Sequence, residues 1–308
     1  MLSTFQHLSP QQLAQLAQLV QKIVQATNPD KIICYGSRIT TMQDWSCFAQ
    51  GTGCKEIAHP TYDLLIIPNS NEKRADHELI QIAEQQALPL GCAVTSVVQK
   101  LASVNSLLEK GARFFATLYR KGVLVYNGSG AALVTPPNEP DITTVKSRIT
   151  DYWDKCFGMA QCFLKSASFC IDGGWHEQAV FNLHQSVQHT CMALLRVFTG
   201  FRSNTHNLAR LLALVQHFSY APMMVFPCIT KEETDLFNTL NKAYSDARYN
   251  ESYMVSVEKA TILMERVSDF IAIAERLYQQ RLLDLENGQS ISFPLIPATY
   301  EEQVHSHQ

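Results

Sequence analysis

The periodicity of the sequence changes at residues 127–141, and this change limits the chain to a two-part architecture. The stretch reads NGSGAALVTPPNEPD, and its Gly, Ser and Pro residues are typical of a linker. Short apolar runs alternate with helical patterns before it, whereas no convincing strand pattern follows it up to about residue 285. A chain of 308 residues also exceeds the usual size of a single core. The sequence therefore predicts an α+β protein of two domains.

The first part combines short strands with helices, which predicts an α/β sandwich with a mixed sheet. Its predicted strands are 31–35, 62–67, 91–98 and 122–126. Its predicted helices are 10–26, 72–86 and 103–120.

The second part carries helical stripes, so we predict an all-α helical bundle. The predicted helices are 143–171, 175–199, 205–218, 231–245 and 252–284. The predicted organisation is an α/β domain, a linker, a helical bundle and a C-terminal tail, with the bounds 1–130, 131–141, 142–285 and 286–308.

Composition and charge restrict the environment and the partners. The net charge of -3 and the pI of about 6.4 argue against a broadly basic surface, so no DNA partner is predicted. No apolar run is long enough to cross a bilayer, so no membrane partner is predicted either. The nine cysteines are odd in number, and the N-terminus lacks the pattern of a signal peptide. We therefore expect a cytoplasmic protein with reduced thiols.

Gly36, Ser37 and Arg38 directly follow an apolar strand. Glycine lets backbone amides approach a phosphate and the serine hydroxyl adds a donor, so we predict a phosphate-binding turn. Asp63 lies in the next predicted strand, where a carboxylate can bind a divalent metal. Over about 31–128 the order of these elements resembles the nucleotidyltransferase fold. That order is a strand, Gly-Ser, a helix, a strand with an acid, a strand, a helix and a final strand. The ending LYRKGVLVY is similar to that of the minimal nucleotidyltransferases of prokaryotes.

This sequence departs from that family in its acidic residues. The family has a second acid two residues after the first, where this chain has Leu65, and the strand GCAVTSVVQ offers no third acid. A single carboxylate, here Asp63, holds Mg²⁺ weakly. We therefore expect a catalytically impaired nucleotidyltransferase-like domain. An insertion over 41–61 lies beside the site, and its Asp44, Glu56 and His59 could supply further groups.

Three segments of the second part resemble the HEPN domain, a family that frequently partners minimal nucleotidyltransferases. The resemblance covers about 142–280. The motifs are the pair His184-Gln185, the start of a helix at Thr205-His206-Asn207-Leu208, and the segment AYSDARYN at 243–250.

The HEPN resemblance implies either nucleotide binding or RNA cleavage. Some HEPN proteins are metal-independent ribonucleases that use an Arg followed, four to six intervening residues later, by a His. Arg210 and His217 fit that spacing, whereas no His follows Arg248 at the required positions. Imidazole would move the 2′-hydroxyl proton and guanidinium would stabilise the phosphorane.

A polar ridge is the alternative site in this part. His184 and Gln185 have polar neighbours four residues later, which places them on one helix face. Such a ridge is either solvated surface, or hydrogen bonding within the bundle, or the lining of a nucleotide cleft. In the last case the resemblance adds further residues to the cleft, namely His206, Asn207, Arg248 and Tyr249. The start of a helix at His206 favours an anion.

The sequence as a whole predicts a nucleotide- or RNA-binding protein with little or no catalysis in its first domain, a homodimer through the bundle, and a possible origin in toxin–antitoxin systems. One alternative is an active enzyme, either a nucleotidyltransferase acting through Asp63 or a ribonuclease acting through Arg210 and His217. The other is a non-catalytic assembly or regulatory protein, whose surfaces bind protein.

Overall fold

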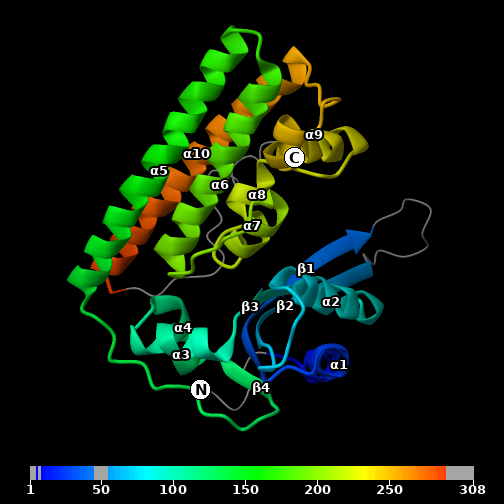
Figure 1. The fold of residues 1–308 in the computed structure, drawn as a ribbon, viewed down its shortest axis with the longest axis vertical. Coiled ribbons are helices and arrows are strands. Elements are labelled where there is room, and N and C mark those ends of the chain that lie inside the picture. The colour runs from blue at the N-terminus through cyan, green and yellow to red at the C-terminus, as the bar shows by residue number, and fades with distance from the viewer. Residues whose placement is uncertain (1–4, 6–7, 45–54, 289–308) are drawn as a thin grey trace. The chain divides into compact units, whose positions relative to one another are not determined.

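The chain folds into two compact units, Met1–Glu139 and Pro140–Gln308. The computed structural model describes residue 5, residues 8–44 and residues 55–288. Figure 1 shows strands and helices in the first unit and helices in the second. Within the described residues every strand lies in the first unit, which confirms the predicted change from mixed to helical structure.

The first unit is built on a four-stranded mixed sheet, as the sequence predicts. The order of the strands is β3-β2-β1-β4, and only β2 and β3 run parallel to each other. The strands are β1 (Lys31–Asp44), β2 (Lys55–Ile67), β3 (Ala93–Val98) and β4 (Val123–Asn127). The helices are α1 (Pro10–Thr27), α2 (Asp76–Ala87), the 3₁₀ helix η1 (Leu88–Leu90), α3 (Leu101–Glu109) and α4 (Arg113–Lys121).

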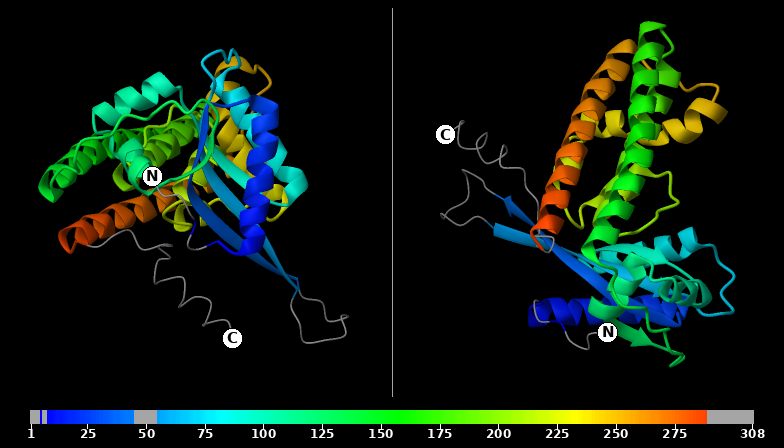
Figure 2. Two further views of the ribbon diagram at one scale, coloured as in Figure 1. Left: turned by 90° about the horizontal axis from the view of Figure 1, so that it is seen from below. Right: turned by 90° about the vertical axis from the view of Figure 1, so that its left-hand side faces the viewer.

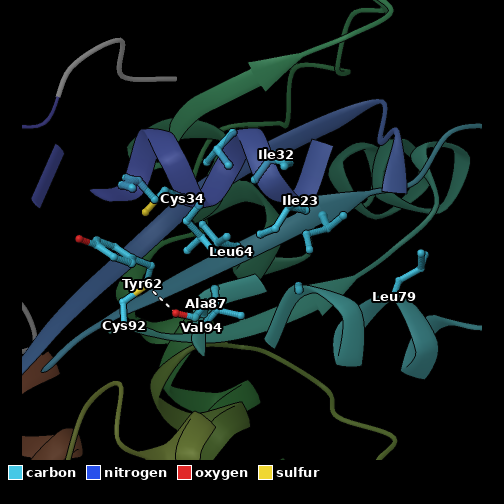
Figure 3. Close-up of a cluster of buried hydrophobic side chains, with 14 of the residues drawn as sticks. Ile23, Ile32, Cys34, Tyr62, Leu64, Leu79, Ala87, Cys92 and Val94 are labelled. Atoms are coloured by element: carbon cyan, nitrogen blue, oxygen red, sulfur yellow. Dashed lines mark hydrogen bonds between the residues drawn. The ribbon is translucent and has the colours of Figure 1, made fainter. Parts of the chain in front are cut away.

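The core of the first unit lies between one face of the sheet and the helices α1 and α2. Alternate residues of β1 and β2 point into it, among them Ile32 and Leu64 (Figure 3). Ile23 of α1 and Leu79 of α2 pack against them, and all four side chains are almost fully buried. Helix α4 packs on β1 through the ring of Phe114, which lies 5.6 Å from that of Tyr35. Asp63, which alternates with the core residues of β2, is also buried, with 2% of its surface exposed.

The turn predicted at Gly36-Ser37 is wrong, whereas phosphate binding at these residues stays a prediction. Strand β1 continues through these residues, and Gly36 pairs with Asp63 of β2 in an antiparallel hairpin. A register shift between Cys34 and Gly36 marks where the pairing changes. Glycine is needed here because a Cβ on residue 36 would lie 2.5 Å from Oδ2 of Asp63. The glycine therefore makes room for a carboxylate of the neighbouring strand.

Two further differences from the sequence predictions lie in the first unit. The single helix predicted at 103–120 is two helices, α3 and α4, because Gly111 between them has a φ of +63°. Strands β1 and β2 are longer than predicted because they continue to pair with each other beyond the residues that pair with β4 and β3. Residues 45–54 of the predicted insertion lie outside the described residues.

The second unit is a bundle whose central element is α6. Three long helices, α5, α6 and α10, lie side by side in Figure 2 and contact one another. Trp153 of α5 stacks on Tyr278 of α10 with 4.2 Å between the ring centroids. Nearly all residues of α6 from Ala179 to Phe198 are buried or half-buried. The helices are α5 (Ile142–Asp172), α6 (His176–Phe198), α7 (Leu208–Val215), α8 (Ala221–Met224), α9 (Lys231–Tyr249) and α10 (Val257–Glu286).

The helix ends in this unit differ from the predicted ones at the candidate site. The helix predicted to begin at Thr205 begins at Leu208, with Asn207 as its N-cap. Helix α9 continues to Tyr249, beyond the predicted end, so Arg248 and Tyr249 lie in its last turn. The short helix α8 was not predicted. No helix in the described part of the chain has the length and apolar character needed to cross a membrane.

Replacement of Gly36 by alanine should destabilise the first unit by about 1–3 kcal/mol, because the new methyl group would displace a buried carboxylate. Hydrogen exchange should become faster in β1 and β2 and remain unchanged in α6. Gly158→Ala is the control: a Cβ there meets no atom within 4 Å, and alanine favours the helical state of α5. Unchanged exchange in β1 and β2 of Gly36→Ala would contradict the tight fit.

Candidate functional site

Asp63, the predicted metal ligand, forms a buried ion pair with Arg38. Nη2 of Arg38 lies 3.0 Å from Oδ1 of Asp63, and both side chains are at most 10% exposed. The same Nη2 donates to the hydroxyl of Thr95 on β3 at 3.2 Å. A buried carboxylate needs an opposite charge, and Arg38 supplies it from the neighbouring strand. Arg38, predicted to bind phosphate, is therefore engaged with the residue predicted to bind metal.

The groups around Asp63 do not fit a magnesium site. Mg²⁺ requires oxygen ligands in octahedral geometry, whereas this single carboxylate faces a guanidinium. Ser96 is fully buried on the next strand, but a neutral hydroxyl is a poor substitute for a second acid. Among the side chains that the structure describes, no group of three or more from His, Cys, Asp or Glu could hold a metal ion. Of the groups in the insertion, the ring of His59 is exposed, and the side chains of Asp44 and Glu56 are not described.

The three HEPN-like motifs come together in the second unit. Nε2 of His184 on α6 lies 2.9 Å from the carbonyl oxygen of His206, in the segment before α7. The amide nitrogen of Gln185 lies 3.2 Å from Nδ1 of His184. The ring of Tyr244 on α9 stacks on both histidines, with centroids 5.6 Å from His184 and 4.0 Å from His206. Residues about 60 positions apart in the sequence thus form one cluster.

These contacts define the tautomer of His184. A carbonyl oxygen can only accept, so Nε2 of His184 carries the proton and donates to His206. Nδ1 then accepts from the amide of Gln185. The side chain is fully buried, and this burial lowers the pKa of His184 from 6.5 to about 4; the hydrogen bond to the backbone of His206 opposes this decrease, and the charges of His206 and Arg248 add to it. His184 is therefore neutral at physiological pH and fixes the backbone of His206.

A second contact orients the ring of His206. Its Nδ1 lies 3.1 Å from Oε1 of Gln188, which is one turn after His184 on α6. Since an amide oxygen accepts, Nδ1 of His206 is the donor and Nε2 is left on the other side of the ring. The side chain of Asn207 accepts from the backbone of Arg210 at 3.0 Å. Asn207 is thus engaged in capping α7.

Arg248 and two tyrosines extend the cluster to the surface. The guanidinium carbon of Arg248 lies 4.0 Å from the ring centroid of Tyr244 and 4.9 Å from that of Tyr249. His206 stacks nearly parallel on Tyr244, at an angle of 8°, so the guanidinium occupies the opposite face. Nε of Arg248 donates to the carbonyl oxygen of Tyr244 at 2.6 Å. Arg248 is exposed, and Tyr249 is 77% exposed.

We call the four residues His206, Tyr244, Arg248 and Tyr249 the aromatic–arginine stack. It consists of an imidazole, a phenol ring and a guanidinium in successive layers, with the Tyr249 ring beside the guanidinium. Cation–π contacts of this kind are worth about 0.5–2 kcal/mol each, and they restrict the arginine to one orientation. The stack therefore offers a positive charge and an exposed aromatic ring that are already in place.

The predicted ribonuclease pair lies on and after α7. Arg210 is half-buried in the first turn of α7, whereas His217 follows the helix and is 8% exposed. A general base must reach the proton that it removes, and burial of His217 restricts this access. The structure therefore brings together the residues of the polar ridge, the residues before α7 and Arg248. Arg210 and His217 lie on and after α7 and are not members of this cluster.

Tyr244 is the member of the stack that the sequence analysis did not single out. Tyr244 and Arg248 are four residues apart on α9, a spacing that places them on one face of a helix. That spacing was available in the sequence, but the predicted helix ended at residue 245, before Arg248. Extending the helix by one turn would have identified the pair.

Comparison with known proteins supports one of the two resemblances. Residues 153–277 match the family model of the HEPN domain. The match spans α6, α7 and α9, so it includes every residue of the cluster. No curated protein matches the chain.

The buried His184 should make the stability of the second unit depend on pH. Because its pKa in the folded state is about 4 and its ordinary value is 6.5, the unfolded state binds more protons between these values. The free energy of unfolding should thus be highest above pH 6.5 and fall as the pH drops towards 4, by at most about 1.4 kcal/mol per pH unit from this residue. His189, whose pKa is also lowered by burial, acts in the same direction.

Urea unfolding followed by the fluorescence of the buried Trp153 measures this dependence at several pH values. His184→Gln should reduce the slope of the free energy of unfolding against pH, since glutamine does not titrate. His77→Gln, at an exposed position of the first unit, should leave the slope unchanged. A slope that is the same in His184→Gln and in the wild type would contradict a neutral His184.

Proposed function

We propose that the second unit binds a nucleotide, either free or as part of an RNA chain, at the aromatic–arginine stack. The observation that carries this proposal is the placement of the Arg248 guanidinium on the face of Tyr244 and beside the exposed Tyr249. A guanidinium suits a phosphate because its planar donors match the phosphate oxygens. An exposed tyrosine ring offers a face on which a base can stack. Both parts of a nucleotide thus find a partner within one turn of α9.

The buried cluster beneath the stack supports the same function. His184 donates to the carbonyl oxygen of His206, and the side-chain oxygen of Gln188 accepts from Nδ1 of His206. Both contacts fix His206. The ring of His206 then holds one face of Tyr244 and restricts that ring to the orientation in which Arg248 covers the other face. A site whose side chains are fixed before binding loses less conformational entropy when the ligand arrives.

For the first unit, we propose a nucleotidyltransferase-like domain that is impaired in metal-dependent transfer. The support is the ion pair between Asp63 and Arg38, which engages the one acid of the motif. Transfer of a nucleotidyl group needs metal ions to neutralise the phosphates, and the residues around Asp63 do not fit that task. The role assigned to this unit is therefore structural or regulatory. Dimerisation through the bundle remains a prediction.

Calorimetric titration with ATP, GTP, CTP and UTP, each with and without Mg²⁺, tests the proposed function. Binding should occur without Mg²⁺, and Arg248→Ala should weaken it about tenfold or more, because a hydrogen bond to a charged group contributes about 1.5–3 kcal/mol. Tyr249→Ala should weaken it through loss of stacking, whereas Tyr249→Phe should retain it. Asp63→Ala should not change it in protein that remains folded.

Arg276→Ala is the matched control, since Arg276 is an exposed arginine of α10 outside the stack. Circular dichroism and the fluorescence of Trp153 should show that each variant keeps the helical fold. The proposal is wrong if none of the four nucleotides binds, or if Arg248→Ala and Arg276→Ala bind equally well.

A further inference from the structure

A second cluster of cations and an aromatic ring lies further along α6. The guanidinium of Arg196, near the C-terminal end of α6, lies 5.1 Å from the ring centroid of Tyr152 on α5. Nη1 of Arg196 also donates to the carbonyl oxygen of Gly200 at 3.0 Å. Burial raises the pKa of Tyr152, a contact with Cys156 adds to the increase, and the charges of Arg196 and Arg202 oppose it. We call Tyr152, Arg196 and Arg202 the second cluster.

The segment 199–207 connects the second cluster to the aromatic–arginine stack. It begins beside Arg196, carries Arg202, and ends at His206 and Asn207. Its exposed side chains can all form hydrogen bonds, and they are Arg202, Asn204, His206 and Asn207. The segment thus presents one cationic and three other polar side chains between Arg202 and Asn207.

Side-chain hydroxyls hold this segment in one conformation. Oγ1 of Thr199 accepts from the backbone of Phe201 at 3.0 Å, and the hydroxyl of Thr205 accepts from the backbone of Asn207 at 3.2 Å. Ser203 is buried and accepts from the backbone of Thr205 at 3.4 Å. Because these contacts fix the backbone, the exposed groups of the segment keep their order in space.

The separation of the two clusters follows from the geometry of α6. His206 contacts α6 at His184 and Gln188, and Arg196 lies eight residues after Gln188. At 1.5 Å of rise per residue, the clusters are about 12–18 Å apart along the helix axis. A single nucleotide bound at Tyr249 occupies one of them, whereas a chain of several nucleotides can reach both.

We propose that segment 199–207 binds a single-stranded nucleic acid, which runs from the aromatic–arginine stack to Arg202 and Arg196. This inference rests on the proposed function and specifies its ligand as a chain of several nucleotides. Single strands are bound by cationic grooves that follow the phosphates, together with aromatic rings on which bases stack. The aromatic–arginine stack lies at one end of the ordered segment, and Arg196 over the half-buried Tyr152 lies at the other. Arg202 contacts phosphate, and Arg196 holds the start of the segment through Gly200.

Fluorescence anisotropy with uridine oligonucleotides of one, three, six and ten residues tests the proposal on the full chain. Affinity should increase with length until both clusters are occupied. Arg202→Ala should weaken binding of the ten-residue RNA about tenfold and leave binding of UMP unchanged, whereas Arg248→Ala should weaken both. The slope of log K against log salt should fall by about 0.7 in Arg202→Ala, as expected for one lost phosphate contact on a single strand. Arg276→Ala should change neither affinity nor slope.

Failure of this inference and failure of the proposed function give different results. If UMP binds in an Arg248-dependent way but longer oligonucleotides bind no more tightly, the proposed function stands and the extended path is wrong. The same conclusion follows if Arg202→Ala keeps the affinity and the salt slope of the wild type. If neither UMP nor any oligonucleotide binds, the extended path is wrong, and the titration with the four nucleotides decides on the proposed function. A parallel measurement with a ten-residue DNA shows whether the sugar contributes to the affinity, since only RNA offers the 2′-hydroxyl.

Discussion

Helix α6 is buried on nearly all sides, so the polar side chains that it carries need partners inside the second unit. Ser186 finds one in the carbonyl oxygen of Ala160 on α5, at 2.9 Å. His184 and Gln188 find theirs in His206, from the segment before α7. The requirement to satisfy these two side chains fixes the end of segment 199–207 against α6. Tyr244 of α9 then stacks on the fixed imidazole, and Arg248 covers Tyr244.

The same constraint explains why the first unit differs from the enzyme-like site that its sequence suggests. Asp63 is buried in the middle of the sheet, where an ionised carboxylate is stable only beside an opposite charge. Arg38 provides that charge from the adjacent strand, and Gly36 provides the space. Gly36, Arg38 and Asp63 thus form a structural contact, although their sequence pattern predicts a phosphate and metal site. The nucleotide binding that we propose therefore lies in the helical unit.

The arrangement of secondary structure could be predicted because it depends on local patterns. The apolar stripes of the second part and the alternation in the first gave the mixed sheet and the helical bundle. The continuation of β1 through Gly36-Ser37 could not be predicted, since a glycine that allows a turn and a glycine that accommodates a neighbouring carboxylate look the same in one sequence. Pairing of β1 with β2 decides between them, and it is a tertiary contact.

The candidate site was predictable in its residues and not in its geometry. His184, Gln185, His206 and Arg248 were identified from their motifs, and the structure shows them within one cluster. The order of the stack was not predictable, because it depends on the exact end of α9 and on the ring of Tyr244. Helix ends are the least certain part of a sequence prediction, and one turn separates Arg248 from the predicted end.

The central claim is that a base stacks at the surface end of the aromatic–arginine stack, and photocrosslinking tests it most directly. A ten-residue RNA with one 4-thiouridine would be irradiated with the full-length protein, and the linked peptide would be identified by mass spectrometry. The account predicts a crosslink within residues 243–250 that disappears in Tyr249→Ala. Crosslinks confined to the first unit, or none above the background of an irradiated control without thiouridine, would contradict it.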